Sequence, residues 1–260
     1  MSLSVQQASW IKFVAVLYVA IAAHISVTPP QPPPSEREGD KPKDDVVKVD
    51  AYRLTRITRR IQWIIYLVQV VAVLAEYFSL NNFPFHLLKA LYSPDFITWH
   101  QPLDAIMLLL TTLGLVLRVW AYATLGRLFT FQLAIRKDHK LIRHGPYKFL
   151  RHPSYTGAFI IVLGTVYFIY EPLMFTTLAH IQPFFKTFGF SSFVNVSLLS
   201  GSSFIHAMVW FPFLAVALVM MKARVQQEEK MLKAEFAKDW AEHEQNTWGV
   251  VPGLGWLLGI

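Results

Sequence analysis

The sequence predicts an all-α membrane protein: a polytopic helical bundle with about five transmembrane helices, a basic loop and a C-terminal amphipathic helix. Of the 260 residues, 54% are apolar and only 16% are charged. The mean hydropathy is +0.37, and the apolar residues form runs long enough to span a bilayer. The chain has no cysteine, which excludes disulfides, cysteine-based zinc sites and thiol nucleophiles.

The first apolar run, residues 10–27, is long enough at about 1.5 Å per residue to cross the hydrocarbon layer. We therefore expect residues 1–27 to form an N-terminal transmembrane helix. A cleaved signal peptide is the alternative, because Ala20 to Ala23 resemble a cleavage site, but the residues before the run carry no charge. Residues 28–59 are proline-rich and then charged, which predicts a solvated linker in the cytosol.

Residues 60–260 form the predicted core. The expected spans are about 61–80, 103–124, 155–172 and 204–221, and they are followed by a charged C-terminal helix at 222–246. Arg118 stands inside one span, where it is either functional or a side chain that snorkels to the surface. The aromatic stretch 173–203 has no clear assignment and is a candidate re-entrant or interfacial segment.

The positive charges follow this segmentation. Of the 24 Lys and Arg residues, 20 lie in segments 28–60, 125–154 and 222–260, which five spans place on one side of the membrane. The positive-inside rule makes that side cytosolic. The net charge of +7 therefore indicates membrane orientation and no nucleic-acid partner. No His, Asp and Glu cluster has metal-ligand spacing, so we predict no metal.

The segment from His139 to Gly157 is basic and rich in turn residues, although apolar runs flank it. Gly145-Pro146 predicts a turn. Pro153 predicts a helix start, whose free N–H groups suit an anionic ligand. In the tail, Arg224 and Glu228 stand four residues apart on one helix face. They form either an ordinary surface ion pair or a pair that projects over the loop.

Two blocks of residues carry a family resemblance: Gly145-Pro-Tyr … Arg151-His-Pro-Ser-Tyr-Thr-Gly157, and Arg224 … Glu228-Glu229 … Leu232 … Phe236. Together they resemble the isoprenylcysteine carboxyl methyltransferase family over roughly 120–260, and Leu125 to Gln132 resemble its fungal-type members. The resemblance implies an enzyme that transfers methyl from S-adenosylmethionine to the carboxylate of a C-terminal S-prenylated cysteine. It also implies a multi-pass protein of the endoplasmic reticulum membrane with its active site facing the cytosol. Its partners would be prenylated, CaaX-processed proteins and the lipid bilayer.

The resemblance also implies site residues. The cofactor loop would be 125–157, and Arg224 would hold the substrate carboxylate, with His152 and Tyr155 as further catalytic residues. The implied cofactor-binding residues are Gln132, His139, Lys140, Leu141, Ile142, Tyr147, His152, Pro153, Ser154, Tyr155 and Glu228.

The chain departs from the family pattern in two places. The stretch between Gly157 and Glu228 is longer than in the animal enzymes. Phe236-Ala-Lys-Asp-Trp240 also stands where Phe-Gly-x-x-Tyr is usual.

The expected chemistry needs no general base, because a C-terminal carboxylate has a pKa near 3.5 and is already an anion at neutral pH. Other functions stay open. A methyltransferase for phospholipid amines or small thiols could share the Arg-His-Pro-x-Tyr core. A sterol-reductase-like NADPH enzyme is a further alternative, although Ser154 stands where its motif has Asn. The last alternative is a non-catalytic membrane scaffold.

Overall fold

The structure is a computed structural model that describes residues 5–32, 41–42, 51–78, 80, 102–131, 133–135, 139–170, 203–250 and 255. Its described part contains five α-helices: α1 (Val5–Val27), α2 (Ala51–Tyr77), α5 (Leu103–Leu125), α6 (Pro153–Thr165) and α9 (Ser203–Asn246). A π-helical turn, Val166–Tyr170, continues α6. The strands β1 (Lys41–Pro42) and β2 (Ala134–Ile135) pair antiparallel and are a small exception to the predicted all-α class.

Three of these helices contain stretches long and apolar enough to cross a membrane: Trp10–Val27, Thr55–Ala75 and Leu103–Leu128. They correspond to the first three predicted spans, and they make the chain a membrane protein. The apolar stretch of α6, Pro153–Ile169, is shorter. The unassigned stretch 173–203 lies outside the described residues except for Ser203, where α9 begins.

Two boundaries differ from the sequence-based expectation. Helix α2 begins at Ala51, so the last part of the expected linker is already helical. The fifth expected span and the C-terminal helix form one continuous element, α9, whose break lies at Ala237 rather than near 221. Helix propensity continues through 222–236 because this stretch has neither glycine nor proline.

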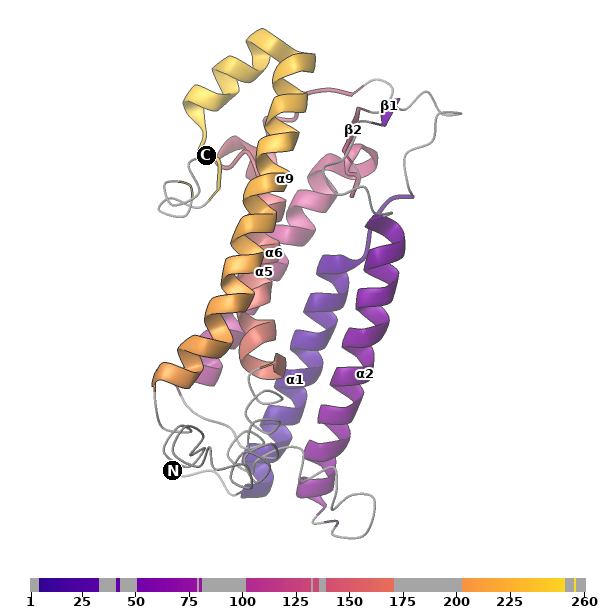
Figure 1. Cartoon of the computed structure of the whole chain (residues 1–260), viewed down its shortest axis with the longest axis vertical. Coiled ribbons are helices and arrows are strands. Elements are labelled where there is room, and N and C mark those ends of the chain that lie inside the picture. The colour runs from indigo at the N-terminus through magenta and orange to yellow at the C-terminus, as the bar shows by residue number, and fades with distance from the viewer. Residues whose placement is uncertain are drawn as a thin grey trace, which may run out of the picture. The chain divides into compact units, whose positions relative to one another are not determined.

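The chain divides into two compact units. The first contains Met1–Ile21, Ile61–Leu110 and Leu163–Ala215, and the second contains Ala22–Arg60, Thr111–Val162 and Val216–Ile260. In the first unit, Ala72 and Val73 of α2 pack with Val68 and with Phe13 of α1, and the two helices lie side by side (Figure 1).

A buried ion pair joins α1 and α5 in the first unit. Nζ of Lys12 lies 3.0 Å from Oδ1 of Asp104, and the two residues are 3% and 0% exposed. The hydroxyl of Tyr167 donates to the same carboxylate oxygen at 2.7 Å, and Lys12 also lies over the ring of Phe168. The π-helical turn is held as well, because Gln69 of α2 donates to the Phe168 carbonyl at 2.6 Å.

In the second unit α5 and α6 approach through two glycines. A Cβ on Gly114 would lie 2.9 Å from the carbonyl oxygen of Gly157, and a Cβ on Gly157 would lie 2.7 Å from that of Gly114. Any larger residue at either position would push the helices apart. This close approach brings the first turn of α6 against α5 near Arg118.

Candidate active site

The loop before α6 is built as the sequence predicts. Gly145 has φ of +61°, and a Cβ there would lie 2.8 Å from the Thr124 hydroxyl, so the position requires glycine. Gly145 is the first residue of a short 3-10 helix, Gly145–Lys148, which has Pro146 in its first turn. Helix α6 then begins at Pro153, which confirms both the predicted turn and the predicted helix start.

A backbone ladder fixes the residues between these two elements. The N–H of Trp248 donates to the carbonyl of Phe149 at 3.1 Å, that of Arg151 to Trp248 at 2.7 Å, and that of His152 to Gly249 at 2.9 Å. Trp248 and Gly249 therefore hold Arg151 and His152 in place through main-chain hydrogen bonds.

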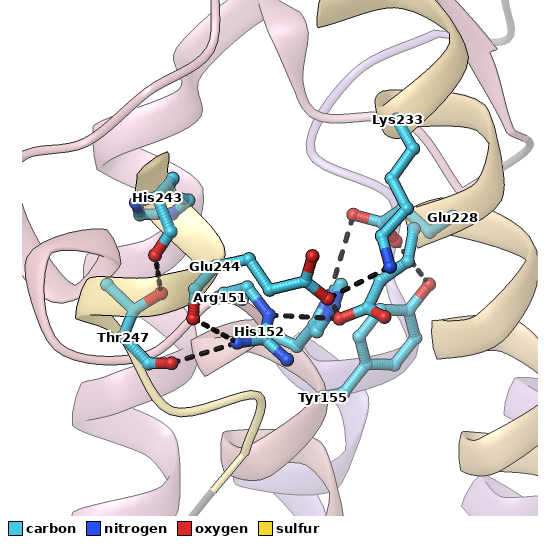
Figure 2. Close-up of polar contacts among 9 residues, drawn as sticks. Arg151, His152, Tyr155, Glu228, Lys233, His243, Glu244 and Thr247 are labelled. Carbon is cyan, nitrogen blue, oxygen red and sulfur yellow. Dashed lines mark hydrogen bonds and ion pairs between the residues drawn. The ribbon is translucent and has the colours of Figure 1, made fainter. Parts of the chain in front are cut away.

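The side chain of His152 lies between two carboxylates of α9. Its Nε2 is 3.2 Å from Oε1 of Glu229, and its Nδ1 is 3.8 Å from Oε1 of Glu228. The Tyr155 hydroxyl donates to Oε2 of Glu228 at 2.8 Å. Figure 2 shows Tyr155 of α6 and Glu228 of α9 next to His152, which directly precedes α6. His152 is only 2% exposed, so this network is built inside the protein.

Arg151 completes the network on the side of Glu229. Its Nε donates to Oε1 of Glu229 at 3.0 Å, and its Nη1 donates to the carbonyls of Thr247 at 2.8 Å and Glu244 at 3.2 Å (Figure 2). Burial alone would raise the pKa of the Glu229 carboxyl. The hydrogen bonds and charges of His152 and Arg151 outweigh burial and lower this pKa below its ordinary value.

The end of α9 folds back after Ala237, whose φ is +31° and ψ −95°. Two residues beyond this break bind Arg143 of the loop. Nη1 of Arg143 donates to Oε2 of Glu242 at 2.8 Å, and its Nη2 donates to the Asp239 carbonyl at 2.5 Å. The folded-back segment brings Trp240 and His243 to the site. Burial lowers the pKa of His243, and the charges of Arg143, Arg151 and His152 lower it further.

These elements enclose a cavity of about 330 Å³, within the size range of small-molecule pockets. Part of its wall is apolar, with Leu125, Leu128, Phe129 and Met220 among the lining residues. Four cationic side chains and one carboxylate also line it: Arg118, Lys140, Arg151, Arg224 and Glu228. The cavity can therefore accept a ligand with apolar, anionic and cationic parts.

Most of the predicted site residues lie around this one cavity. The lining residues among them are His139, Lys140, Leu141, Ile142, Tyr147, His152, Ser154, Tyr155, Arg224 and Glu228. Pro153 is buried as the first residue of α6 and does not line the cavity. Gln132 lies outside the described residues. The Nη2 of Arg224 donates to the Phe131 carbonyl at 2.6 Å, which holds the tail helix against the segment before β2.

Sequence reasoning did not place Trp240 and His243 in the wall of the cavity, and it left open whether Arg118 is functional or snorkels to the surface. It assigned Glu228 to the cofactor, and Glu228 does line the cavity, but it did not foresee that Glu229 pairs with Arg151. The one sequence signal for Trp240 was that it replaces a usual Tyr. Among the described residues, no group of three His, Asp or Glu side chains is arranged to hold a metal ion.

Residues 106–190 match the family model of the isoprenylcysteine carboxyl methyltransferase (ICMT) family. A probable protein-S-isoprenylcysteine O-methyltransferase of Oryza sativa subsp. japonica is 37% identical over 90 residues, 34% of this chain and 47% of the rice protein. Protein-S-isoprenylcysteine O-methyltransferase B of Arabidopsis thaliana is 30% identical over 142 residues, 54% of each chain. The corresponding protein of Schizosaccharomyces pombe is 46% identical over 55 residues, 20% of this chain and 23% of the yeast protein.

The chain thus matches about half the length of the rice and Arabidopsis relatives. None of the solved structures matches it. Residues 106–190 and the relatives that share this region make this part of the chain similar to the isoprenylcysteine carboxyl methyltransferase family.

Proposed function

We propose that this protein transfers a methyl group from S-adenosylmethionine to the C-terminal carboxylate of an S-prenylated cysteine. The observation that carries the proposal is a cavity lined together by the loop residues His139 to Ile142, by His152 and Tyr155, and by Arg224 and Glu228 of α9. The similarity of residues 106–190 to the isoprenylcysteine carboxyl methyltransferase family suggests the reaction class, and the cavity supplies groups of the right charge for both substrates.

The residues around the cavity fit S-adenosylmethionine. Glu228 is the one carboxylate among the described residues that line the cavity, and it suits the cofactor's ammonium group. The indole Nε1 of Trp240 and Nδ1 of His152 are buried and have no hydrogen-bond partner among the described residues. Buried polar atoms of this kind are normally satisfied, and a ligand rich in donors and acceptors would satisfy them. Aromatic side chains such as Tyr147 would face its adenine or sulfonium.

Arg224 is the residue that would bind the acceptor carboxylate. A guanidinium can grip a carboxylate with two parallel hydrogen bonds and so orient one oxygen for attack. The bond from Arg224 to the Phe131 carbonyl holds this side chain in place before a ligand arrives. No residue is needed as a base, because the carboxylate is ionised at neutral pH.

The chain's contribution to the reaction is therefore positioning and exclusion of water. The bound cofactor would supply an electrophilic methyl on its sulfonium. The Tyr155 hydroxyl holds the Glu228 carboxylate with a hydrogen bond of 2.8 Å, and the ladder to residues 248 and 249 fixes His152. The folded-back end of α9 adds Trp240 and His243 to the wall and shields the site.

The proposal includes the topology. The protein would cross the membrane of the endoplasmic reticulum about five times, with the linker, the cofactor loop and the C-terminal helix in the cytosol. Prenylated, CaaX-processed proteins would be its substrates, and their prenyl chains would enter from the bilayer. The domain boundaries predicted from the sequence and the likeness to fungal-type members stay predictions.

The test is to identify the methylated product. Membranes containing this protein should transfer labelled methyl from S-adenosylmethionine to N-acetyl-S-farnesylcysteine and give a base-labile ester. Membranes containing Glu228→Gln should give much less ester, and Arg127→Met should resemble the wild type, since Arg127 is exposed and does not line the cavity. Labelled phospholipid or small thiol without ester would contradict the proposed acceptor.

A further inference from the structure

The strand β2 has a main-chain partner that the sequence does not predict. Lys41 and Pro42 of β1, within the expected solvated linker, pair antiparallel with Ile135 and Ala134 of β2 (Figure 1). Part of the linker therefore lies against the loop that supplies much of the cavity wall. The pairing also shows that the main chain of β2 accepts an extended peptide.

The segment that ends in β2 forms part of the cavity wall. Thr130, Phe131, Leu133 and Ala134 all line the cavity. Leu133, Ala134 and Ile135 are only 4%, 2% and 5% exposed. What β2 offers to a partner strand is therefore its N–H and C=O groups, as the edge of any strand does.

Arg224 places the proposed acceptor carboxylate near the start of this segment. Its Nη2 donates to the Phe131 carbonyl at 2.6 Å, and Ala134 follows Phe131 in the same segment. An extended chain advances about 3.3 Å per residue, so about 10 Å of peptide leads from Phe131 to Ala134. The second and third residues before a terminal cysteine held by Arg224 therefore reach β2.

The direction of this path agrees with the predicted topology. Both β1 and β2 belong to segments that the positive charges predict to be cytosolic. A prenyl chain enters from the bilayer, whereas the rest of a prenylated protein stays in the cytosol. The peptide that joins the two parts has to leave the cavity on the cytosolic side, where β2 lies in this topology.

Strand β1 is a weak partner for β2. It has two residues, fewer than an ordinary strand, and Pro42 has no backbone N–H to donate. A peptide with an N–H on each residue forms a stronger pair. Buried main-chain groups need a partner, and exchange of one strand for the other leaves those of β2 paired before and after.

We propose that β2 is the docking edge for the main chain of the acceptor protein, and that β1 occupies this edge until the acceptor replaces it. The inference rests on the proposed function, because the peptide extends from a carboxylate held by Arg224. Pairing of this kind depends on main-chain hydrogen bonds and tolerates different side chains. The linker is then a competitor of the acceptor within the same chain.

The first experiment compares three acceptors on the wild-type protein in lipid nanodiscs. They are N-acetyl-S-farnesylcysteine, a hexapeptide that ends in S-farnesylcysteine, and the same hexapeptide N-methylated at the second and third residues before the cysteine. N-methylation removes the N–H donors and keeps the side chains. We expect kcat/KM for the ordinary peptide to exceed that for the N-methylated peptide by about 3- to 10-fold.

The second experiment locks β1 onto β2. The chain has no cysteine, and Lys41 is paired directly with Ile135. Paired Cα atoms of antiparallel strands lie about 4.5 to 5.5 Å apart, which a disulfide can span. Lys41→Cys together with Ile135→Cys should therefore form one disulfide on oxidation.

The oxidised double variant should methylate both peptides alike, and reduction should restore its preference for the ordinary peptide. Its kcat/KM for N-acetyl-S-farnesylcysteine should change by about 2-fold or less on oxidation, because this acceptor has no peptide to pair with β2. Lys41→Cys alone is the control and should not respond to oxidation.

Lys41→Pro replaces the double variant as the test if the latter does not fold. It removes a backbone donor from β1 and should raise kcat/KM for the ordinary peptide by about 2- to 5-fold. Lys43→Pro removes the same charge just beyond β1 and should leave this value unchanged.

Equal kcat/KM values for the two peptides in the wild type would show that the acceptor does not pair with β2, and the proposal would be wrong. It is also wrong if the oxidised double variant keeps the preference or, where that variant does not fold, if Lys41→Pro gives no increase. A wild-type protein that methylates none of the three acceptors contradicts the proposed function instead.

Discussion

Nζ of Lys233 lies 2.9 Å from Oε1 of Glu244, although the two residues stand about three helical turns apart in the sequence. In a straight helix their Cα atoms would be separated by about 16 Å along the axis. The contact therefore depends on the break at Ala237, after which the last residues of α9 change direction (Figure 1). The backbone conformation of Ala237 therefore determines the direction of the last residues of α9.

Replacing Ala237 by glycine should stabilise the protein. The positive φ of Ala237 costs an L-residue about 1 to 2 kcal/mol, whereas glycine adopts it freely. After the entropic cost of glycine, the free energy of unfolding should rise by about 0.5 to 1 kcal/mol. Thermal unfolding in detergent measures the difference.

Ala234→Gly is the matched control, because Ala234 is exposed on the regular part of the same helix. It should lower the free energy of unfolding by about 1 kcal/mol. If both glycines destabilise the protein equally, Ala237 is not strained.

Substitution of Arg224 tests its proposed role toward the acceptor. Arg224→Ala should raise KM for N-acetyl-S-farnesylcysteine by about 10- to 100-fold, since a charged hydrogen-bond partner of the carboxylate is lost. The Kd for S-adenosylhomocysteine should stay within about 3-fold of the wild type. Steady-state kinetics and calorimetry provide the two values. Loss of cofactor binding alone would show that Arg224 has been assigned to the wrong ligand.

Removing the charge of Glu229 should destabilise the protein. Glu229→Gln leaves Arg151 and His152 without their shared carboxylate, at a cost of about 3 kcal/mol. The unfolding midpoint at pH 7 should fall by about 6 to 12 °C. Because the folded-state pKa of Glu229 is lowered, its stabilising effect is complete above the ordinary carboxyl pKa and is lost as the pH falls through the lowered value.

The difference between Glu229→Gln and the wild type should therefore shrink in acid. Glu235→Gln, on an exposed position of the same helix, should change the midpoint little at any pH. A midpoint difference that stays constant down to pH 3 would refute the assignment of this stability to the Glu229 charge.

His243 should make the protein less stable in mild acid. Its pKa is lowered in the folded state, so the unfolded chain takes up the proton first as the pH falls below about 6.5. Stability from the neutral imidazole is complete above that pH and declines as the pH falls toward the lowered value. His243→Phe keeps an aromatic ring beside Trp240. In this variant the unfolding midpoint should change less between pH 7 and pH 5 than it does in the wild type. An unchanged slope in this variant would assign the acid sensitivity to another group.

Much of the helical architecture could be predicted from the sequence, because apolar runs and prolines report on local structure. The helix start at Pro153 and the turn at Gly145 are confirmed for this reason. The three long apolar helices were visible as runs of span length. These features depend on neighbouring residues only.

Features that depend on distant residues could not be predicted. The sequence position of Arg118 does not reveal that Ser26 and Ser154 meet it. In the same way, the pairing of Arg151 with Glu229 depends on how the tail crosses the loop. The break at Ala237 was concealed because alanine favours the helix that it interrupts here. Only the replacement of a usual glycine at this position hinted at it.

The ion pair between Lys12 and Asp104 has a consequence for biosynthesis. The two residues are 92 positions apart, and at about 5 to 20 residues per second the ribosome needs roughly 5 to 20 s to travel from one to the other. During that interval Asp104 is absent, so the ion pair that buries Lys12 in the folded protein cannot form. The buried contact between α1 and α5 is therefore completed only after α5 has been made.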